Sequence, residues 1–273
     1  MTITQTMKRG YLTAVIGTTL AGKGLLADMP EIVANSVLPA RRIPIEFTAS
    51  DGVVLVGELA LPLDRDPVAT VICLHPLPTH GGYMDSHVFR KAAWRLPALT
   101  DFAVLRFNFR GVTSARGTSG GEFTAGPGEG LDAQAAIQWA VAQGLPHIHC
   151  LGWSFGTDVT LRYCNTDPVE GGILLSPPLR WTDESDLAAW AASGRPLTAV
   201  VPELDDYLQP EEARARFAVV PQAHVIGVDG AKHLWVGEKN VQAALNAVVA
   251  AVDPAKSPLP LEFDGPMERW SDL

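Results

Sequence analysis

The sequence predicts an α/β protein in which helices cover both faces of a mostly parallel sheet. Two observations support this prediction. From Arg41 onward, strand-like segments alternate with segments whose apolar residues have helical spacing. Runs such as "ATVICLH" (Ala69–His75) are apolar throughout, which is typical of strands buried on both faces. Because no composition break marks a second domain, we expect one domain over 41–252 with extensions at 1–40 and 253–273.

The first half of the domain opens on a predicted hairpin. The turn dipeptide Asp51-Gly52 lies between the β-rich runs "RRIPIEFTAS" and "VVLVGELALP". After the strand at Ala69–His75, helical spacing predicts a helix that Ser86 can cap and that Pro97 ends or kinks. The remaining elements of this half are a strand at 102–111 and, after a glycine-rich loop, a helix at about 130–143.

The second half continues the alternation of strands and helices. Short apolar runs predict the strands, and apolar residues at helical spacing predict the helices. The expected strands are 147–153, 171–178, 196–203 and 223–229, and the expected helices are 155–165, 210–217 and 241–252. The proline-containing tail from Pro254 is expected to be a surface extension.

Composition argues against several classes of function. A formal net charge of -9 disfavours a general nucleic-acid binder, because neutralising phosphates needs a basic surface. Three cysteines without CxxC spacing predict neither a disulfide framework nor a structural zinc site, and they suit a reducing cytoplasm. His147 and His149 could share a strand face, but no third ligand is recognisable nearby. We therefore expect no metal and no cofactor.

The N-terminal segment leaves three interpretations open. Lys8 and Arg9 precede the apolar run "GYLTAVIGTTLAG", as in a secretory signal, but the run breaks at Lys23 and no clean cleavage site follows at once. The run is also too short to span a bilayer, so we expect no stable membrane insertion. We favour an extension packed on a cytoplasmic protein, with a membrane-surface segment or a signal peptide as alternatives.

The stretch Gly152-Trp153-Ser154-Phe155-Gly156 lies between a predicted buried strand and a predicted helix. In a G-x-S-x-G turn the glycines permit a sharp bend around a strained serine, which lifts the hydroxyl out of the sheet edge. The N-terminus of the following helix stabilises negative charge at the same place. An ordinary strand–helix turn is the alternative, but this position predicts that Ser154 is a nucleophile.

A serine nucleophile needs a base, and the base needs an orienting carboxylate. The loops after two later strands offer both, because "PELDDYLQP" holds three carboxylates and "GAKHLW" holds His233. Both loops follow the carboxyl ends of strands, where the active-site crevice of such a sheet lies. We favour Asp206 as the acid, with Asp205 second and Glu203 third.

Backbone N–H groups are expected to stabilise the charge that develops on the substrate oxygen. Phe155, which follows the nucleophile, should donate one, and the loop after "ICLH" should donate the other. In that loop Pro76 and Pro78 have no N–H, so Leu77 is the nearest candidate.

Several stretches together resemble the α/β-hydrolase superfamily, and more closely a lid-poor bacterial group of serine hydrolases related to dienelactone hydrolases. They are "LHPLPTHGGYMDSHVF", "LRFNFRGVTSARG", "GEGLDAQAAIQW", "GWSFG", "ELDDYLQP" and "GAKH". The resemblance covers about Arg41–Val252 and implies Ser154 as nucleophile, Asp206 as acid and His233 as base. Two departures are Leu77, where the group often has a second His, and the serine, where dienelactone hydrolases use Cys.

The resemblance implies a cofactor-free hydrolase of small-molecule carboxylic esters that forms an acyl-enzyme on Ser154. Acyl transfer and thioester or peptide cleavage use the same triad, and a non-catalytic ligand-binding homologue is a further alternative. Many relatives insert a helical cap between the strands expected at 171–178 and 196–203. This chain has room there for a short helix only, which favours small or exposed esters.

Three residues are candidate substrate contacts: His75, Trp153 and Trp181. For His75, as for His80, the alternatives are a role in orienting the oxyanion loop and partial exposure without a role. For Trp181 the alternative is simple packing against the sheet. The sequence leaves these alternatives open.

Overall fold

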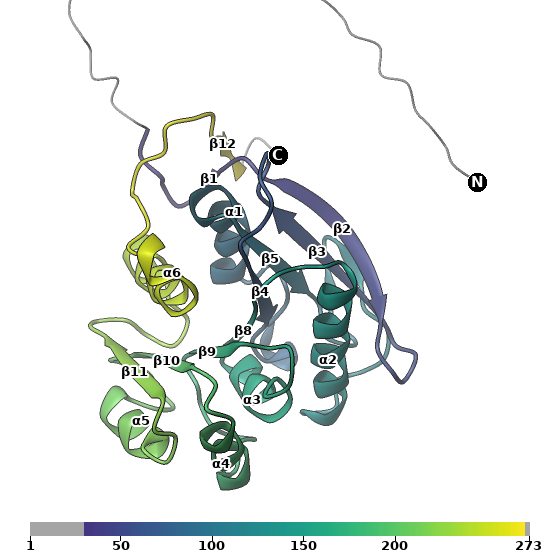
Figure 1. Cartoon of the computed structure of the whole chain (residues 1–273), viewed down its shortest axis with the longest axis vertical. Helices are drawn as coiled ribbons and strands as arrows, with labels where there is room; N and C mark the ends of the chain where they lie inside the picture. The colour runs from purple at the N-terminus through teal and green to yellow at the C-terminus, as the bar shows by residue number, and fades with distance from the viewer. Residues whose placement is uncertain (1–29, 271–273) are drawn as a thin grey trace, which may run out of the picture.

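The computed structural model describes residues 30–270, and its main feature is an eight-stranded sheet ordered β11-β10-β9-β8-β4-β5-β3-β2 (Figure 1). β2 (Arg41–Thr48) and β3 (Val54–Leu61) form the expected antiparallel hairpin, and β3 is also antiparallel to β5 (Phe102–Phe107). From β5 to β11 all neighbouring strands are parallel. The other strands of this sheet are β4 (Ala69–Leu74), β8 (Ile148–Trp153), β9 (Gly171–Leu175), β10 (Leu197–Pro202) and β11 (Ala223–Val228).

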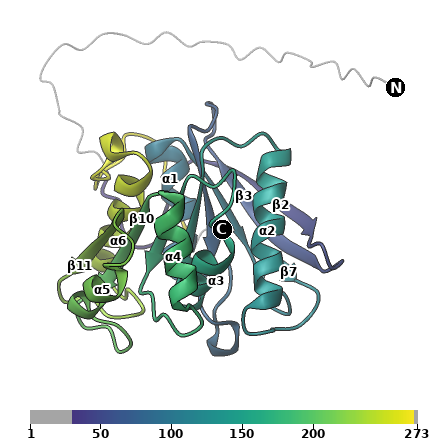
Figure 2. The ribbon, with the colours of Figure 1, turned by 60° about the horizontal axis from the view of Figure 1, so that its bottom comes forward.

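Helices cover both faces of the sheet (Figure 2). Two helices share one apolar cluster on the first face: α1 (His87–Thr100) and α6 (Glu238–Val252). Four helices pack on the opposite face: α2 (Pro127–Ala142), α3 (Phe155–Tyr163), α4 (Glu184–Ser193) and α5 (Pro210–Phe217). The predicted α/β class, with a mostly parallel sheet and helices on both faces, is confirmed.

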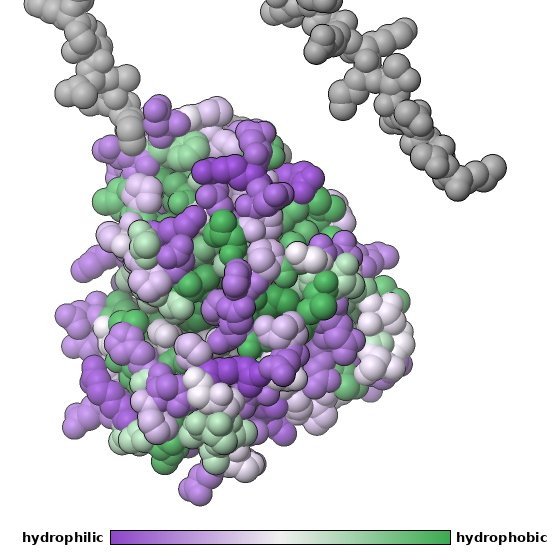
Figure 3. Space-filling view, viewed as in Figure 1, coloured by the Kyte–Doolittle hydropathy of each residue, from purple (hydrophilic) through white to green (hydrophobic). Residues whose placement is uncertain are grey.

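The burial of each strand follows from its place in the sheet. Every residue of β4, β5, β8, β9 and β10 is buried, in agreement with their continuous apolar sequences. β2 lies at the edge and exposes charged residues such as Arg41 and Glu46, which discourage pairing with another chain. On the face seen in Figure 3, hydrophilic residues surround smaller groups of hydrophobic ones.

Helix α1 does not end at Pro97 but continues to Thr100. Proline has no N–H, so the carbonyl of Ala93 receives no helical hydrogen bond from position 97. The side chain of Arg42 donates to that carbonyl instead, at 3.4 Å. Ser86 occupies the N-cap position, but its hydroxyl makes no capping hydrogen bond.

The chain segment that precedes the large sheet in sequence pairs with the segment that follows it. β1 (Ser36–Val37) is antiparallel to β12 (Glu268–Arg269), and Leu259 of the tail is buried in the core. The tail is therefore more than the expected surface extension. The smaller elements are β6 (Thr113–Ser114), β7 (Gly117–Thr118) and the 3-10 turns η1 (Pro78–His80) and η2 (Pro254–Lys256).

The interpretations of residues 1–29 as a packed extension, a membrane-surface segment or a signal peptide fall outside the part of the chain that the structure describes. Within residues 30–270, no helix has both the length and the apolar character needed to cross a bilayer.

Candidate active site

Ser154 lies in a sharp turn between β8 and α3. Its backbone has φ 52° and ψ -119°, a conformation that is strained for a residue with a side chain. The N–H of Ser154 donates to the carbonyl of Leu175 on β9, at 2.9 Å. Thr157 donates to the carbonyl of Ser154 through its N–H at 2.8 Å and its hydroxyl at 2.7 Å. The neighbouring strand and helix thus hold the strained serine in place.

The two glycines of the motif are required by close backbone contacts. A Cβ atom on Gly152 would lie 2.3 Å from the carbonyl oxygen of Gly156. A Cβ atom on Gly156 would lie 1.8 Å from the carbonyl oxygen of Leu74 at the end of β4. Both distances are shorter than atoms tolerate, so this turn excludes larger residues at either position.

His233 links the serine to a carboxylate. Its Nε2 lies 2.8 Å from Oγ of Ser154, and its Nδ1 lies 2.9 Å and 3.0 Å from the two carboxylate oxygens of Asp205. An ionised carboxylate only accepts hydrogen bonds, so Nδ1 carries the ring proton and Nε2 is free to accept the serine proton. The site thus places a hydroxyl, an imidazole and a carboxylate in hydrogen-bonded sequence, an arrangement that can activate the hydroxyl as a nucleophile.

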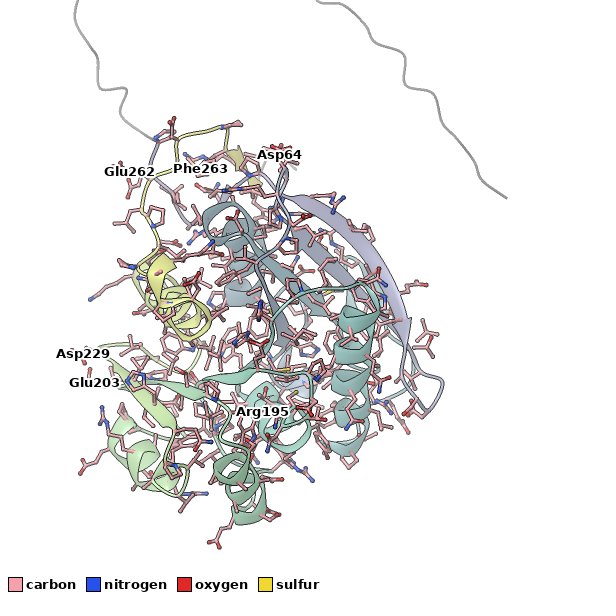
Figure 4. The ribbon with its side chains drawn as sticks, viewed as in Figure 1. Asp64, Arg195, Glu203, Asp229, Glu262 and Phe263 are labelled. Atoms are coloured by element: carbon pink, nitrogen blue, oxygen red, sulfur yellow. The ribbon has the colours of Figure 1, made fainter. Side chains whose placement is uncertain are left out.

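The prediction that Asp206 is the carboxylate beside His233 is wrong, because Asp205 makes that contact. Asp206 is exposed, whereas Asp205 is only 4% exposed. The N–H of Tyr207 donates to Oδ1 of Asp205 at 2.9 Å and helps to turn that carboxylate inward. Glu203 accepts from the N–H of Gly230 at 2.7 Å and lies near Asp229 at the outer edge of the sheet (Figure 4).

Two hydrogen bonds to the carbonyl of His233 hold the loop that bears this residue. The indole N–H of Trp153 donates to the carbonyl of His233 at 3.2 Å, and the hydroxyl of Ser176 donates to the same oxygen at 3.1 Å. The ring of Tyr207 lies 4.6 Å from the imidazole, centre to centre. Trp153 is buried and outside the pocket that contains Ser154, but it lines a neighbouring hollow, so its expected role as a substrate contact stays a prediction.

Sequence reasoning missed Ser176 and Tyr207. The backbone of Ser176 has a φ of 51°, and this left-handed conformation has no recognisable sequence signal. Tyr207 lies in the loop that bears Asp205. Because its side chain is exposed, the sequence gives no sign that its ring lies beside His233.

Leu77 and Phe155 both line the pocket that contains Ser154. Among the hydrogen bonds formed within residues 30–270, neither backbone N–H has an acceptor. The peptide after Leu77 is fixed because its carbonyl accepts the N–H groups of His80 and Gly82, each at 3.0 Å. Two unpaired donors beside a serine hydroxyl suit a developing oxyanion.

His75 is fully buried and orients the loop that carries Leu77. Its Nε2 accepts the N–H of Phe109 at 3.0 Å, so Nδ1 carries the proton and donates to the carbonyl of Pro76 at 2.7 Å. Burial lowers the pKa of His75 to about 4, and the hydrogen bond to Pro76 opposes this only in part. His75 is outside the pocket, so its expected role as a substrate contact is wrong and the loop-orienting alternative fits.

The pocket has a volume of about 310 Å³, and Trp181 forms part of its wall. The buried carboxylate of Asp158 on α3 holds that wall. One of its oxygens accepts the N–H of Trp181 at 3.1 Å, the N–H of Thr182 at 3.0 Å and the hydroxyl of Thr182 at 2.6 Å. Burial raises the pKa of Asp158, against the effect of these hydrogen bonds. Sequence reasoning missed Asp158, because the pattern of α3 gives no sign that its carboxylate faces a loop.

Residues 30–270 contain no group of three or more His, Cys, Asp or Glu side chains placed to hold a metal ion. His147 instead contacts Glu170 at 2.8 Å, and Nδ1 of His149 lies 3.0 Å from the carbonyl of His147.

Comparison with known proteins gives one curated relative and many structural neighbours. No family model matches the chain. The uncharacterized protein RP471 of Rickettsia prowazekii is 34% identical over 126 residues, which are 45% of this chain and 50% of that protein. The match thus spans about half the length of that relative.

Similar solved structures include α/β serine hydrolases and an esterase. XC6422 of Xanthomonas campestris, described as an α/β serine hydrolase without a lid, is 26% identical, with a TM-score of 0.65 over 84% of this chain and 99% of its own. An α/β serine hydrolase homologue from Coxiella burnetii is 24% identical, with a TM-score of 0.61 over 76% and 95%. The Pyrococcus furiosus esterase Pf2001 is 22% identical, with a TM-score of 0.58 over 71% and 83%. The fold is thus the α/β-hydrolase fold, and the resemblance to lid-poor serine hydrolases is confirmed.

Proposed function

We propose that this α/β-hydrolase-fold chain is a serine hydrolase that cleaves carboxylic esters through an acyl-enzyme on Ser154. The observation that carries the proposal is the continuous contact from Asp205 through His233 to the serine hydroxyl, at 2.9 Å and 2.8 Å. That arrangement activates a hydroxyl for attack on a carbonyl carbon. The reaction requires no cofactor.

In the first half of the reaction, Oγ of Ser154 attacks the ester carbonyl while His233 takes its proton. The negative charge that forms on the substrate oxygen is stabilised by the N–H groups of Phe155 and Leu77. His233 then gives the proton to the departing alcohol, and Asp205 stabilises the transient imidazolium. The carbon–oxygen bond of the ester breaks, and an acyl group remains on the serine.

In the second half, water attacks the acyl-enzyme and His233 takes a proton from that water. The same N–H groups stabilise the second tetrahedral intermediate, and its collapse releases the carboxylic acid. The proton on His233 returns to Oγ of Ser154, which restores the enzyme.

The site favours small or exposed esters. The pocket of about 310 Å³ lies at the small end of the usual range for ligand sites, and the segment between β9 and β10 contains only the ten-residue helix α4. We expect 4-nitrophenyl acetate and butyrate to be hydrolysed with at least about tenfold higher kcat/KM than the palmitate.

Hydrolysis of 4-nitrophenyl acetate tests the proposal, with esters, thioesters and amides of matched leaving groups measured in parallel. Ser154→Ala should abolish turnover, and Ser185→Ala on exposed α4 should leave it unchanged. Preference for a thioester or an amide would replace ester hydrolysis by one of the alternatives. A folded enzyme without activity on any activated acyl compound would support the non-catalytic alternative.

A further inference from the structure

A second hollow, which we call the cationic pocket, lies beside β5 and α1 and has a volume of about 430 Å³. Arginines from four parts of the chain line it, and two tryptophans form much of its apolar wall. The arginines are Arg42, Arg90, Arg106 and Arg116, and the tryptophans are Trp94 and Trp270. Such a concentration of positive charge stands out in a chain whose formal net charge is -9.

The carboxylates that residues 30–270 place around the cationic pocket are fewer than its arginines. Arg106, which is 1% exposed, contacts the buried carboxylate of Glu58 and lies 2.7 Å from Asp85. Arg116 pairs with the second oxygen of Glu58 at 2.5 Å. Within residues 30–270, the ion pairs of the four guanidinium groups therefore involve two carboxylates, and Glu268 attracts Arg42 without forming an ion pair with it. Among these described residues, the arginines outnumber the acids.

Arg90 is the arginine best placed to meet a ligand. Its guanidinium carbon lies 5.0 Å from the ring centre of Trp94 and 4.6 Å from that of Trp270. Within residues 30–270 its buried Nε has no hydrogen-bond partner. Among the described residues, Arg42 and Arg106 also have a buried Nε without a partner. Buried donors without acceptors are costly, and an anion would satisfy them.

A third hollow of about 400 Å³ lies between the cationic pocket and the pocket of Ser154. It shares Tyr83, Asp85 and Arg90 with the cationic pocket, and it shares Pro76, His80 and Leu234 with the pocket of Ser154. Because the same side chains border neighbouring hollows, the three adjoin in series, and we call this series the groove.

We propose that the cationic pocket is a subsite for the anionic end of the ester substrate, a carboxylate or a phosphate group. The ester carbonyl lies at Ser154, a chain of the substrate follows the groove, and the anion accepts hydrogen bonds from Arg90 and its neighbouring arginines. The rings of Trp94 and Trp270 position the guanidinium of Arg90 for this contact. This inference rests on the proposed function and names the class of substrate.

Matched pairs of charged and neutral esters test the subsite. The carboxylate is placed on the alcohol side in 6-acetoxyhexanoate and on the acyl side in mono-4-nitrophenyl adipate, each compared with its neutral amide. The acetyl ester of 4-hydroxybutyl phosphate, compared with its neutral dimethyl phosphate triester, tests phosphate. In at least one pair, the wild-type enzyme should favour the anion by about tenfold in kcat/KM, as one charged hydrogen bond would give.

Substitution of Arg90 should remove that preference. In Arg90→Gln the ratio of charged to neutral kcat/KM should fall to near one, and Arg90→Lys should keep part of it. Arg214→Gln, on the exposed face of α5, is the matched control and should keep the full ratio. A wild-type ratio of one in every pair, or equal ratios in the Arg90→Gln and Arg214→Gln enzymes, would overturn the subsite.

Direct binding separates this inference from the proposed reaction. Calorimetric titration of the Ser154→Ala protein with adipate and with inorganic phosphate needs no catalysis. Binding that Arg90→Gln weakens by about tenfold would keep the subsite even if no ester were hydrolysed. Ester hydrolysis without any such binding, and without preference for charged esters, would leave the proposed function intact and refute the subsite.

Discussion

Asp205 holds Nδ1 of His233 between its two carboxylate oxygens, at 2.9 Å and 3.0 Å, while the next residue, Asp206, is exposed. This contact fixes the ring so that Nε2 meets the hydroxyl of Ser154. Of these two neighbouring residues, Asp205 is thus a buried partner of His233, and Asp206 is a solvated charge.

Substitution of the two neighbouring aspartates should therefore have unequal effects. Asp205→Asn should lower kcat by about 10⁴, because the amide favours the wrong tautomer of the imidazole. Asp206→Asn should stay within about twofold of the wild type, as is usual for a surface change. Steady-state hydrolysis of 4-nitrophenyl acetate measures both. Similar losses in the two variants would show that the loop rearranges in solution.

Gly156 should tolerate no larger residue. In Gly156→Ala the new Cβ would lie 1.8 Å from the carbonyl oxygen of Leu74, so β4 and α3 must move apart. We expect a loss of about 3 kcal/mol or more in the free energy of unfolding, measured in urea. Gly144→Ala, where a Cβ meets open space, should cost only the strain of its φ of +71°, about 1–2 kcal/mol. Equal losses would mean that the close approach at Gly156 is absent.

His75 should make stability depend on pH. Its pKa is about 4 in the folded state against an ordinary 6.5, so the unfolded chain binds the proton first as the pH falls. Stability should therefore decrease from about pH 6.5 to about pH 4, by about 3 kcal/mol for this group. Urea unfolding at pH 7 and pH 4.5 should show a smaller difference for His75→Gln than for the wild type. His224→Gln, an exposed control, should follow the wild type, and parallel curves for all three proteins would refute the assignment.

Asp158 should act through the pocket wall and not through the chemical step. Asp158→Ala removes the acceptor for the N–H groups of Trp181 and Thr182, so the wall loses its support. We expect KM for 4-nitrophenyl butyrate to rise about tenfold with a smaller change in kcat. Asp158→Asn keeps an oxygen acceptor and should restore KM to within about threefold of the wild type. A fall in kcat alone would assign Asp158 a different role.

The features that could be predicted from the sequence depend on local backbone geometry. The turn at Asp51-Gly52 and the turn around Ser154 each need particular residues at fixed positions, so the motif reveals the structure. The order of serine, acidic loop and histidine follows from the chain path of the parallel sheet.

The features that could not be predicted depend on contacts between distant segments. The choice of Asp205 over Asp206 depends on how the N–H of Tyr207 turns a carboxylate. The burial of His75 depends on Phe109, 34 residues away in sequence. The pairing of β1 with β12 involves two residues on each side, which is too short for a periodic pattern.

The most direct test of the account is the site of covalent labelling by a fluorophosphonate probe. We expect one adduct per chain by intact mass, on the peptide that contains Ser154, and none in Ser154→Ala. Labelling should be much slower in His233→Ala, because the hydroxyl loses its base. Unchanged labelling of Ser154→Ala, or no labelling of the folded wild-type protein, would contradict the claim that Ser154 is the nucleophile.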